Sequence, residues 1–203
     1  MKALYVTDRA ALGDEHFSRI LAELSGAPEL TVELREKETE DRVCLAWARL
    51  AHERLGIGVL LLVNRRFDVA LLAEADGVHL PADGFPLQRV RAHTPRGFRI
   101  GVSTHSPEEA EAAIGSGADL VVLGPIFRTP SKKPFGEPLG PGALGRLPLR
   151  RTHQSEVFAI GGIDEAAIAD LEPHRDRISG VAGIRLFQNA TDPRQLVERI
   201  AVR

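Results

Sequence analysis

Short apolar runs alternate with amphipathic segments along the whole chain, and this alternation sets narrow limits on the fold. The run at residues 59–63, VLLLV, is apolar at every position, as expected for a parallel strand that is covered on both faces. Strand composition recurs at residues 3–6, 30–34, 59–63, 77–80, 99–102, 119–123, 157–160 and 179–184. Eight strands separated by helices favour a (β/α)8 TIM barrel, with an open doubly wound sheet as the alternative.

The segments between these strands carry helical periodicity. Helices are predicted at residues 14–24, 39 or 40 to 55, 67–74, 87–93, 107–115 and 192–202. The helix at 107–115 has a well-marked start, because Ser106 can cap it and Pro107 suits its first position. A typical barrel has about 250 residues, so this chain must have short helices and loops. We predict one compact α/β barrel domain over residues 1–203.

Composition excludes several classes of protein. Lys and Arg number 26 against 28 Asp and Glu, so no global positive field is available to hold a nucleic acid. No apolar run is long enough to span a bilayer, and the N-terminus lacks the pattern of a leader peptide. We therefore expect a cytoplasmic protein with no membrane or nucleic-acid partner, and a homo-oligomer stays an open alternative.

Polar clusters follow two neighbouring strands within residues 100–135. Ser103, Thr104, His105 and Ser106 follow the fifth strand, and a cluster containing Thr129, Ser131, Lys132 and Lys133 follows the sixth. The carboxyl ends of parallel strands share one rim, so these side chains are expected to converge on one ligand. A cationic rim rich in hydroxyl groups indicates a phosphorylated small molecule.

Two of these residues are candidates for catalysis. His105 lies among hydroxyl groups at a strand end and could transfer a proton, although a lone histidine is more often structural. Lys132 lies in a long loop, where a ligand contact is expected, and the alternative is a solvated surface pair with Lys133. His79 is expected to be a packed or hydrogen-bonding residue.

Glycines mark the ends of the last two strands. Gly161, Gly162 and Ile163 follow the seventh strand, and Gly183 and Ile184 close the eighth. Barrels commonly hold a phosphate at this place through backbone N–H groups. We therefore predict a phosphate site there, with simple tight turns as the alternative.

The end of the second strand carries charge. Period-two alternation places Glu33, Arg35 and Lys37 on one side of that strand, at the mouth of the barrel. They are interpreted either as ligand contacts or as a structural cluster of ion pairs.

Five motifs, in order and spacing, resemble the thiamine-phosphate synthase and TenI family. They are LREK at residues 34–37, ADGVHL at 75–80, GVSTHS at 101–106, GPIF at 124–127 followed by Thr129 and Lys132-Lys133, and AIGGI at 159–163. The resemblance covers nearly the whole chain and implies a (β/α)8 barrel that acts in thiamine biosynthesis. It implies that Arg35, Lys37, Asn64, Ser103 and Lys132 surround a pyrimidine and its pyrophosphate, while Thr129 and the glycine turns face a thiazole phosphate.

The chain also departs from the family pattern. Arg65 stands where the synthase has a metal-binding aspartate, Asp83 lies one position before the second metal carboxylate, and Glu33 replaces a glutamine. An arginine repels Mg²⁺ and removes an oxygen ligand, so no metal site is assigned and Asp83 is the one carboxylate considered. Pro125 stands where TenI-type tautomerases carry a histidine, so a tautomerase would need another proton carrier, and His105 is the nearest matching candidate.

Three hypotheses follow. The first is a TenI-like thiazole tautomerase, an isomerase that acts on a phosphorylated thiazole without a cofactor. The second is a divergent thiamine-phosphate synthase, a transferase that uses Mg²⁺ to join a pyrimidine diphosphate to a thiazole phosphate. The third is a regulatory protein that binds the phosphorylated ligand without turnover.

Overall fold

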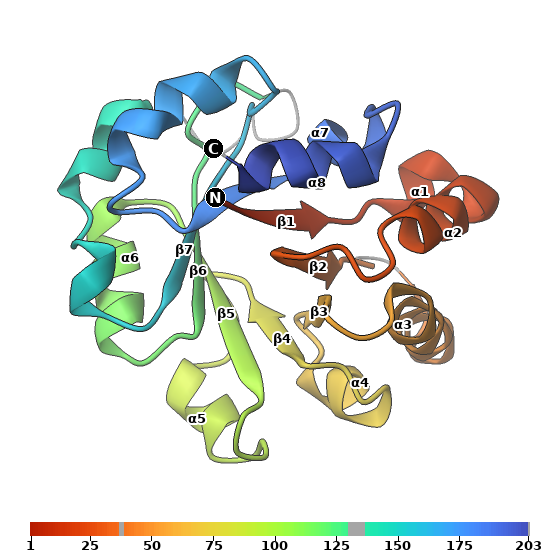
Figure 1. The fold of residues 1–203 in the computed structure, drawn as a ribbon. Coiled ribbons are helices and arrows are strands. Elements are labelled where there is room, and N and C mark those ends of the chain that lie inside the picture. Colours follow the sequence, from red (N-terminus) through yellow and green to blue (C-terminus); the bar gives the residue numbers. More distant parts are fainter. Residues whose placement is uncertain (37–38, 130–136, 203) are drawn as a thin grey trace.

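Eight parallel strands close into a barrel in a computed structural model that describes residues 1–36, 39–129 and 137–202 (Figure 1). The strands are β1 (Lys2–Val6), β2 (Leu30–Leu34), β3 (Leu60–Asn64), β4 (Gly77–Leu80), β5 (Arg99–Thr104), β6 (Leu120–Leu123), β7 (Glu156–Ile160) and β8 (Gly180–Gly183). Each strand pairs with the next in the sequence, and β8 closes the ring by pairing with β1 at Lys2 and Gly180. The predicted fold class is confirmed.

Helices surround the strands, as Figure 1 shows. They are α1 (Arg9–Leu12), α2 (Asp14–Glu23), α3 (Asp41–Leu55), α4 (Phe67–Leu72), α5 (Leu87–Arg91), α6 (Pro107–Gly115), α7 (Arg185–Gln188) and α8 (Pro193–Ala201). The start of α6 has the predicted cap, since the Glu109 N–H donates to the Ser106 hydroxyl at 3.1 Å. In the described part of the chain, no helix combines the length and apolar character needed to cross a bilayer.

The connections after β6 and β7 differ from an ordinary barrel. They form the 3₁₀ helices η2 (Pro141–Arg146), η3 (Arg150–Thr152) and η4 (Ala167–His174) in place of longer α-helices. Pro173 lies inside η4, and a proline without an N–H cannot continue the α-helical hydrogen-bond ladder. These short elements, like α1 and α7, have no periodic pattern in the sequence from which they could be predicted.

The core has two apolar layers. One lies between strands and helices and contains most of the buried aliphatic side chains. The other fills the barrel interior and consists of Leu4, Val6, Leu62, Leu120, Val122, Phe158 and Ala182. Because alternate residues of a strand point to opposite faces, β1, β3, β6, β7 and β8 contribute to both layers.

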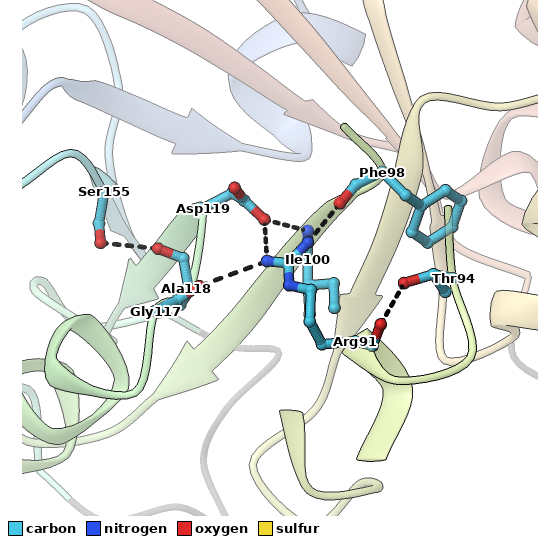
Figure 2. A network of polar contacts seen from close by, with 8 residues as sticks. All are labelled: Arg91, Thr94, Phe98, Ile100, Gly117, Ala118, Asp119 and Ser155. Carbon is cyan, nitrogen blue, oxygen red and sulfur yellow. Dashed lines mark hydrogen bonds and ion pairs between the residues drawn. The ribbon is translucent and has the colours of Figure 1, made fainter. Parts of the chain in front are cut away.

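The amino end of the barrel is held by a repeated hydrogen bond. The residue just before β4, β6 and β8 accepts a bond from the N–H of the second residue of the preceding strand. These bonds run from Leu61 to Asp76 (2.7 Å), from Ile100 to Asp119 (2.8 Å) and from Val157 to Ser179 (3.1 Å). Figure 2 shows that Asp119 also meets the guanidinium of Arg91, which donates to the Phe98 and Gly117 carbonyls. These bonds tie neighbouring strands together at the amino end, while the loops after the strands lie at the opposite, carboxyl rim.

Candidate active site

Four polar side chains from adjacent strands meet inside the barrel near its carboxyl rim. Asn64 Nδ2 on β3 donates to Glu33 Oε1 on β2 at 2.7 Å. His79 on β4 places Nδ1 3.8 Å from Glu33 Oε2 and Nε2 2.8 Å from the Ser103 hydroxyl on β5. Glu33 and His79 are 3% and 1% exposed, whereas Asn64 and Ser103 are half-buried. A polar chain, Asn64–Glu33–His79–Ser103, therefore crosses four strands inside the barrel.

Gly101 makes room for the imidazole in this chain. It pairs with His79 in the parallel register, and a Cβ at Gly101 would lie 2.6 Å from His79 Nδ1. A side chain there would push the ring out of place. The expectation that His79 is packed and hydrogen-bonded agrees with the structure, but its neighbours were not predictable from local sequence.

The loop after β2 is anchored to the loop after β1. The Arg35 N–H donates to the Thr7 hydroxyl at 2.9 Å, and Arg9 pairs with the Glu36 carboxylate at 2.9 Å. The Arg9 guanidinium also lies 4.9 Å from the centre of the Trp47 ring. These contacts hold the half-buried Arg35 at the rim, where the sequence predicts a ligand contact.

Fewer residues of the cluster after β5 reach the site than the sequence predicts. Only Ser103 points into the barrel, because β5 extends to Thr104 and alternation turns Thr104 outward, where its hydroxyl donates to the Val122 carbonyl at 3.2 Å. Ser106 caps α6. His105 Nδ1 lies 2.9 Å from the Gly124 carbonyl oxygen, so its ring is held against the loop after β6.

The glycines after β7 allow two loops to pack closely. Gly161 and Gly162 have φ values of 100° and 66°, in the left-handed region that favours glycine. A Cβ at Gly162 would lie 2.6 Å from the Arg128 carbonyl oxygen. The Phe127 N–H donates to the Gly161 carbonyl at 2.9 Å, so the loop after β6 lies directly against this turn.

The end of β8 adds a cation that the sequence did not single out. Gly183 ends β8 on the same rim as Gly162, and Arg185 opens α7 directly after Ile184. The exposed Arg185 guanidinium donates to the Thr129 hydroxyl at 3.3 Å. Thr129, Gly162, Gly183 and Arg185 thus gather on the β6–β8 side of the rim, where the predicted phosphate would be held.

The described carboxylates do not form a site that fits Mg²⁺. Arg65 Nη2 lies 3.6 Å from Asp83 Oδ1, so the carboxylate considered as a ligand is paired with an arginine. Within residues 1–36, 39–129 and 137–202, no group of three or more His, Cys, Asp or Glu side chains could hold a metal. Arg66 bonds to Asp68, and this interaction holds the pKa of that carboxyl below its ordinary value.

Some candidate residues lie outside the described part of the chain. They are Lys37 beyond β2 and Ser131, Lys132 and Lys133 beyond β6. Their predicted roles as ligand contacts, and that of Lys132 in catalysis, stay predictions.

A comparison with known protein families matches nearly the whole barrel. The family described as thiamine monophosphate synthase matches residues 3–187, a range that contains residues of all eight strands. This chain belongs to that family. The resemblance stated from the five sequence motifs is confirmed.

Relatives within the thiamine monophosphate synthase family match along nearly the full chain. A Geobacter sulfurreducens protein whose name gives thiamine-phosphate synthase as a provisional assignment is 38% identical over 195 residues, 94% of this chain and 88% of the relative. A Roseiflexus protein named thiamine-phosphate synthase is 37% identical, over 93% of this chain and 78% of its own length. The solved thiamine phosphate pyrophosphorylase from Pyrococcus furiosus is 27% identical, with a TM-score of 0.79 over 99% of this chain and 94% of that chain.

Proposed function

We propose that this protein is a thiamine-phosphate synthase, a transferase that joins a pyrimidine diphosphate to a thiazole phosphate and releases pyrophosphate. The observation that carries the proposal is the match to synthases over more than nine-tenths of the chain. The rim supports it because it offers two polar regions, the β2–β5 chain and the β6–β8 phosphate side. A reaction between two phosphorylated heterocycles needs two such regions.

Each region fits one half of the reaction. Ser103, Asn64 and Arg35 would contact the pyrimidine and its diphosphate from β5, β3 and the end of β2. The turns at Gly162 and Gly183, with Thr129 and Arg185, would hold the thiazole phosphate by backbone N–H groups and a guanidinium. The two ligands would then approach each other across the barrel mouth, so the site acts chiefly by positioning.

The proposed reaction places negative charge on the departing pyrophosphate, and the site must stabilise that charge. The thiazole nitrogen forms a bond to the pyrimidine methylene carbon, and the carbon–oxygen bond to the diphosphate breaks with its electron pair leaving on pyrophosphate. Cationic side chains at the rim, among them Arg35 and the exposed Arg65, would stabilise this charge. Mg²⁺ would neutralise the same charge when bound with substrate phosphates, but the described carboxylates offer it no ligand cluster.

The thiazole tautomerase hypothesis has less support than the synthase hypothesis. The matched relatives quoted above carry synthase names, and neither is named a tautomerase. His105, the candidate proton carrier of the tautomerase hypothesis, has its ring nitrogen Nδ1 against the Gly124 carbonyl. The comparisons leave tautomerisation and binding without turnover undistinguished, so both enter the test.

The test is one assay with parallel arms. Purified protein is incubated with pyrimidine diphosphate and thiazole phosphate, with Mg²⁺ or with EDTA, and thiamine phosphate is measured. A second arm supplies the isomeric thiazole carboxylate phosphate alone and measures ring isomerisation. Thiamine phosphate formation supports the synthase, whereas isomerisation without coupling replaces it by the tautomerase. Ligand binding without either product would leave the regulatory protein.

A further inference from the structure

We propose that Arg65 binds the diphosphate group of the substrate directly, and that Asp83 holds the Arg65 guanidinium until the ligand displaces it. The two residues thus form an anion site that works without a divalent cation. The inference rests on the proposed function for the identity of the ligand. The site itself rests on the contacts of the loops after β3 and β4.

The loop after β3 gives Arg65 a fixed starting point. Asn64 is the last residue of β3 and pairs with His79 on β4. The Arg65 N–H continues this pairing by donating to the His79 carbonyl oxygen at 2.8 Å. Arg65 also has a φ of 64°, a left-handed value that ends the extended course of the strand. The side chain therefore leaves the backbone at the carboxyl rim, next to the region where the diphosphate is expected.

The loop after β4 places Asp83 beside this guanidinium. A turn over residues 81–84 is closed by a backbone hydrogen bond of 2.9 Å between its last and first residues. Phe85 follows the turn, and its ring packs edge-on against Phe67 of α4, with 6.4 Å between the ring centres. Phe67 lies two residues after Arg65 in the chain, so this aromatic contact holds the two loops together.

The Arg65–Asp83 pair is loose enough for a ligand to open. Arg65 Nη2 lies 3.6 Å from Asp83 Oδ1, beyond ordinary hydrogen-bond length, and the two side chains are 53% and 79% exposed. Exposed pairs of this kind contribute little to stability. Arg66 differs, because its hydrogen bonds to Asp68 and Asp41 occupy all three nitrogens of its guanidinium and raise its pKa. Of these two neighbours, Arg65 is therefore the one that can turn to a diphosphate, whose oxygens suit a guanidinium fork.

The carboxylates near Arg65 favour this anion site over a metal site. Four carboxylates at this end of the rim already have partners, namely Glu33 with Asn64, Glu36 with Arg9, Asp41 with Arg66 and Asp83 with Arg65. Mg²⁺ needs hard oxygen ligands in near-octahedral geometry, so binding here would have to break such a pair beside a guanidinium. A diphosphate bound to Arg65 needs no carboxylate, and the pair with Asp83 is the one contact that it replaces.

The first measurement is calorimetric titration of the full chain with inorganic pyrophosphate, in EDTA and in Mg²⁺. The wild type should bind in EDTA, and Mg²⁺ should not tighten binding by more than about threefold. Arg65→Ala should weaken binding in EDTA about tenfold, because a charge-assisted hydrogen bond is lost. Arg49→Ala is the matched control, since Arg49 is an exposed arginine that donates to the Leu72 carbonyl, and it should bind as the wild type does. Binding that requires Mg²⁺, or equal affinity of Arg65→Ala and the wild type, overturns the proposal.

The second measurement distinguishes a carboxylate that holds Arg65 from one that binds a metal. Asp83→Asn removes the charge that competes with the ligand for the guanidinium, and the exposed side chain can change without disturbing the core. Pyrophosphate should then bind about twofold to fivefold more tightly, in EDTA and in Mg²⁺ alike. A metal ligand predicts the opposite sign, because its loss weakens binding in Mg²⁺. Unchanged or weaker binding by Asp83→Asn would refute the inference.

Neither measurement needs turnover. If the coupling assay fails while pyrophosphate binds in EDTA through Arg65, the proposed reaction is wrong and the anion site stands. If coupling occurs but pyrophosphate binds only with Mg²⁺, the synthase stands and this inference falls.

Discussion

Replacing Asp119 by alanine should destabilise the barrel while leaving the rim intact. The carboxylate accepts the Ile100 N–H at 2.8 Å and pairs with Arg91, at the amino end of the barrel (Figure 2). Ile100 is fully buried, so its N–H would lose its partner in a place that water reaches poorly. The carboxyl rim, where the ligands are expected to bind, lies at the opposite end of the strands.

The loss of folding stability in Asp119→Ala can be estimated from the two contacts of the carboxylate. Losing a hydrogen bond from a buried N–H to a charged acceptor costs about 1.5–3 kcal/mol. The Arg91 pair is worth less, up to about 1 kcal/mol, because the two side chains are 36% and 29% exposed. A total of about 1.5–4 kcal/mol corresponds to a fall in Tm of roughly 3–16 °C for a chain of this size.

Asp119→Asn separates the two contributions. An amide oxygen can still accept the Ile100 N–H, and only the charge is lost, so its Tm should fall by roughly 4 °C at most. The assay is thermal unfolding of both variants. Calorimetric titration with a phosphate ester then measures whether the ligand affinity of the carboxyl rim has changed. Equal losses of Tm in the two variants would show that the Ile100 bond does not contribute. A change of more than about threefold in ligand affinity would show that the two ends are not independent.

Three further predictions concern the rim. Arg185→Ala should weaken phosphate-ester binding about tenfold in calorimetry, because a charge-assisted hydrogen bond is lost; unchanged affinity would place the phosphate elsewhere. Lys132→Ala should weaken the same binding without abolishing it, since the backbone donors near Gly162 and Gly183 do not depend on a lysine; complete loss would contradict the backbone site. Arg65→Asp should raise the Mg²⁺-dependent part of any coupling rate, since it removes a cation 3.6 Å from Asp83 and adds oxygen ligands; an unchanged or lower rate with Mg²⁺ would count against it.

The strands were predictable because each has a strong local signal. Parallel strands in a barrel are covered on both faces, so they appear as short apolar runs such as residues 59–63. The short elements were not predictable, because one helical turn such as α7 has no periodicity and Pro173 interrupts η4. The end of β5 was placed two residues early, which hid the outward orientation of Thr104.

The sequence predicted which residues lie at the ends of the strands, but not which side chains contact one another there. Ser103 and the glycine turns lie at the rim as expected, since that placement follows from the order of strands. The contact of His79 with Glu33 and that of Arg185 with Thr129 join residues far apart in the chain, and only the closed barrel brings them together. Such contacts depend on tertiary packing, which local patterns do not encode.

The most direct test of the proposed function is the simultaneous measurement of thiamine phosphate and pyrophosphate from the two heterocyclic substrates. The proposed reaction releases one pyrophosphate for each thiamine phosphate formed, because the same step breaks one bond and makes the other. We expect equal amounts of the two products, at a rate that falls in Ser103→Ala and in Arg185→Ala. Pyrophosphate released without thiamine phosphate, or neither product when both substrates are shown to bind, would contradict the assignment.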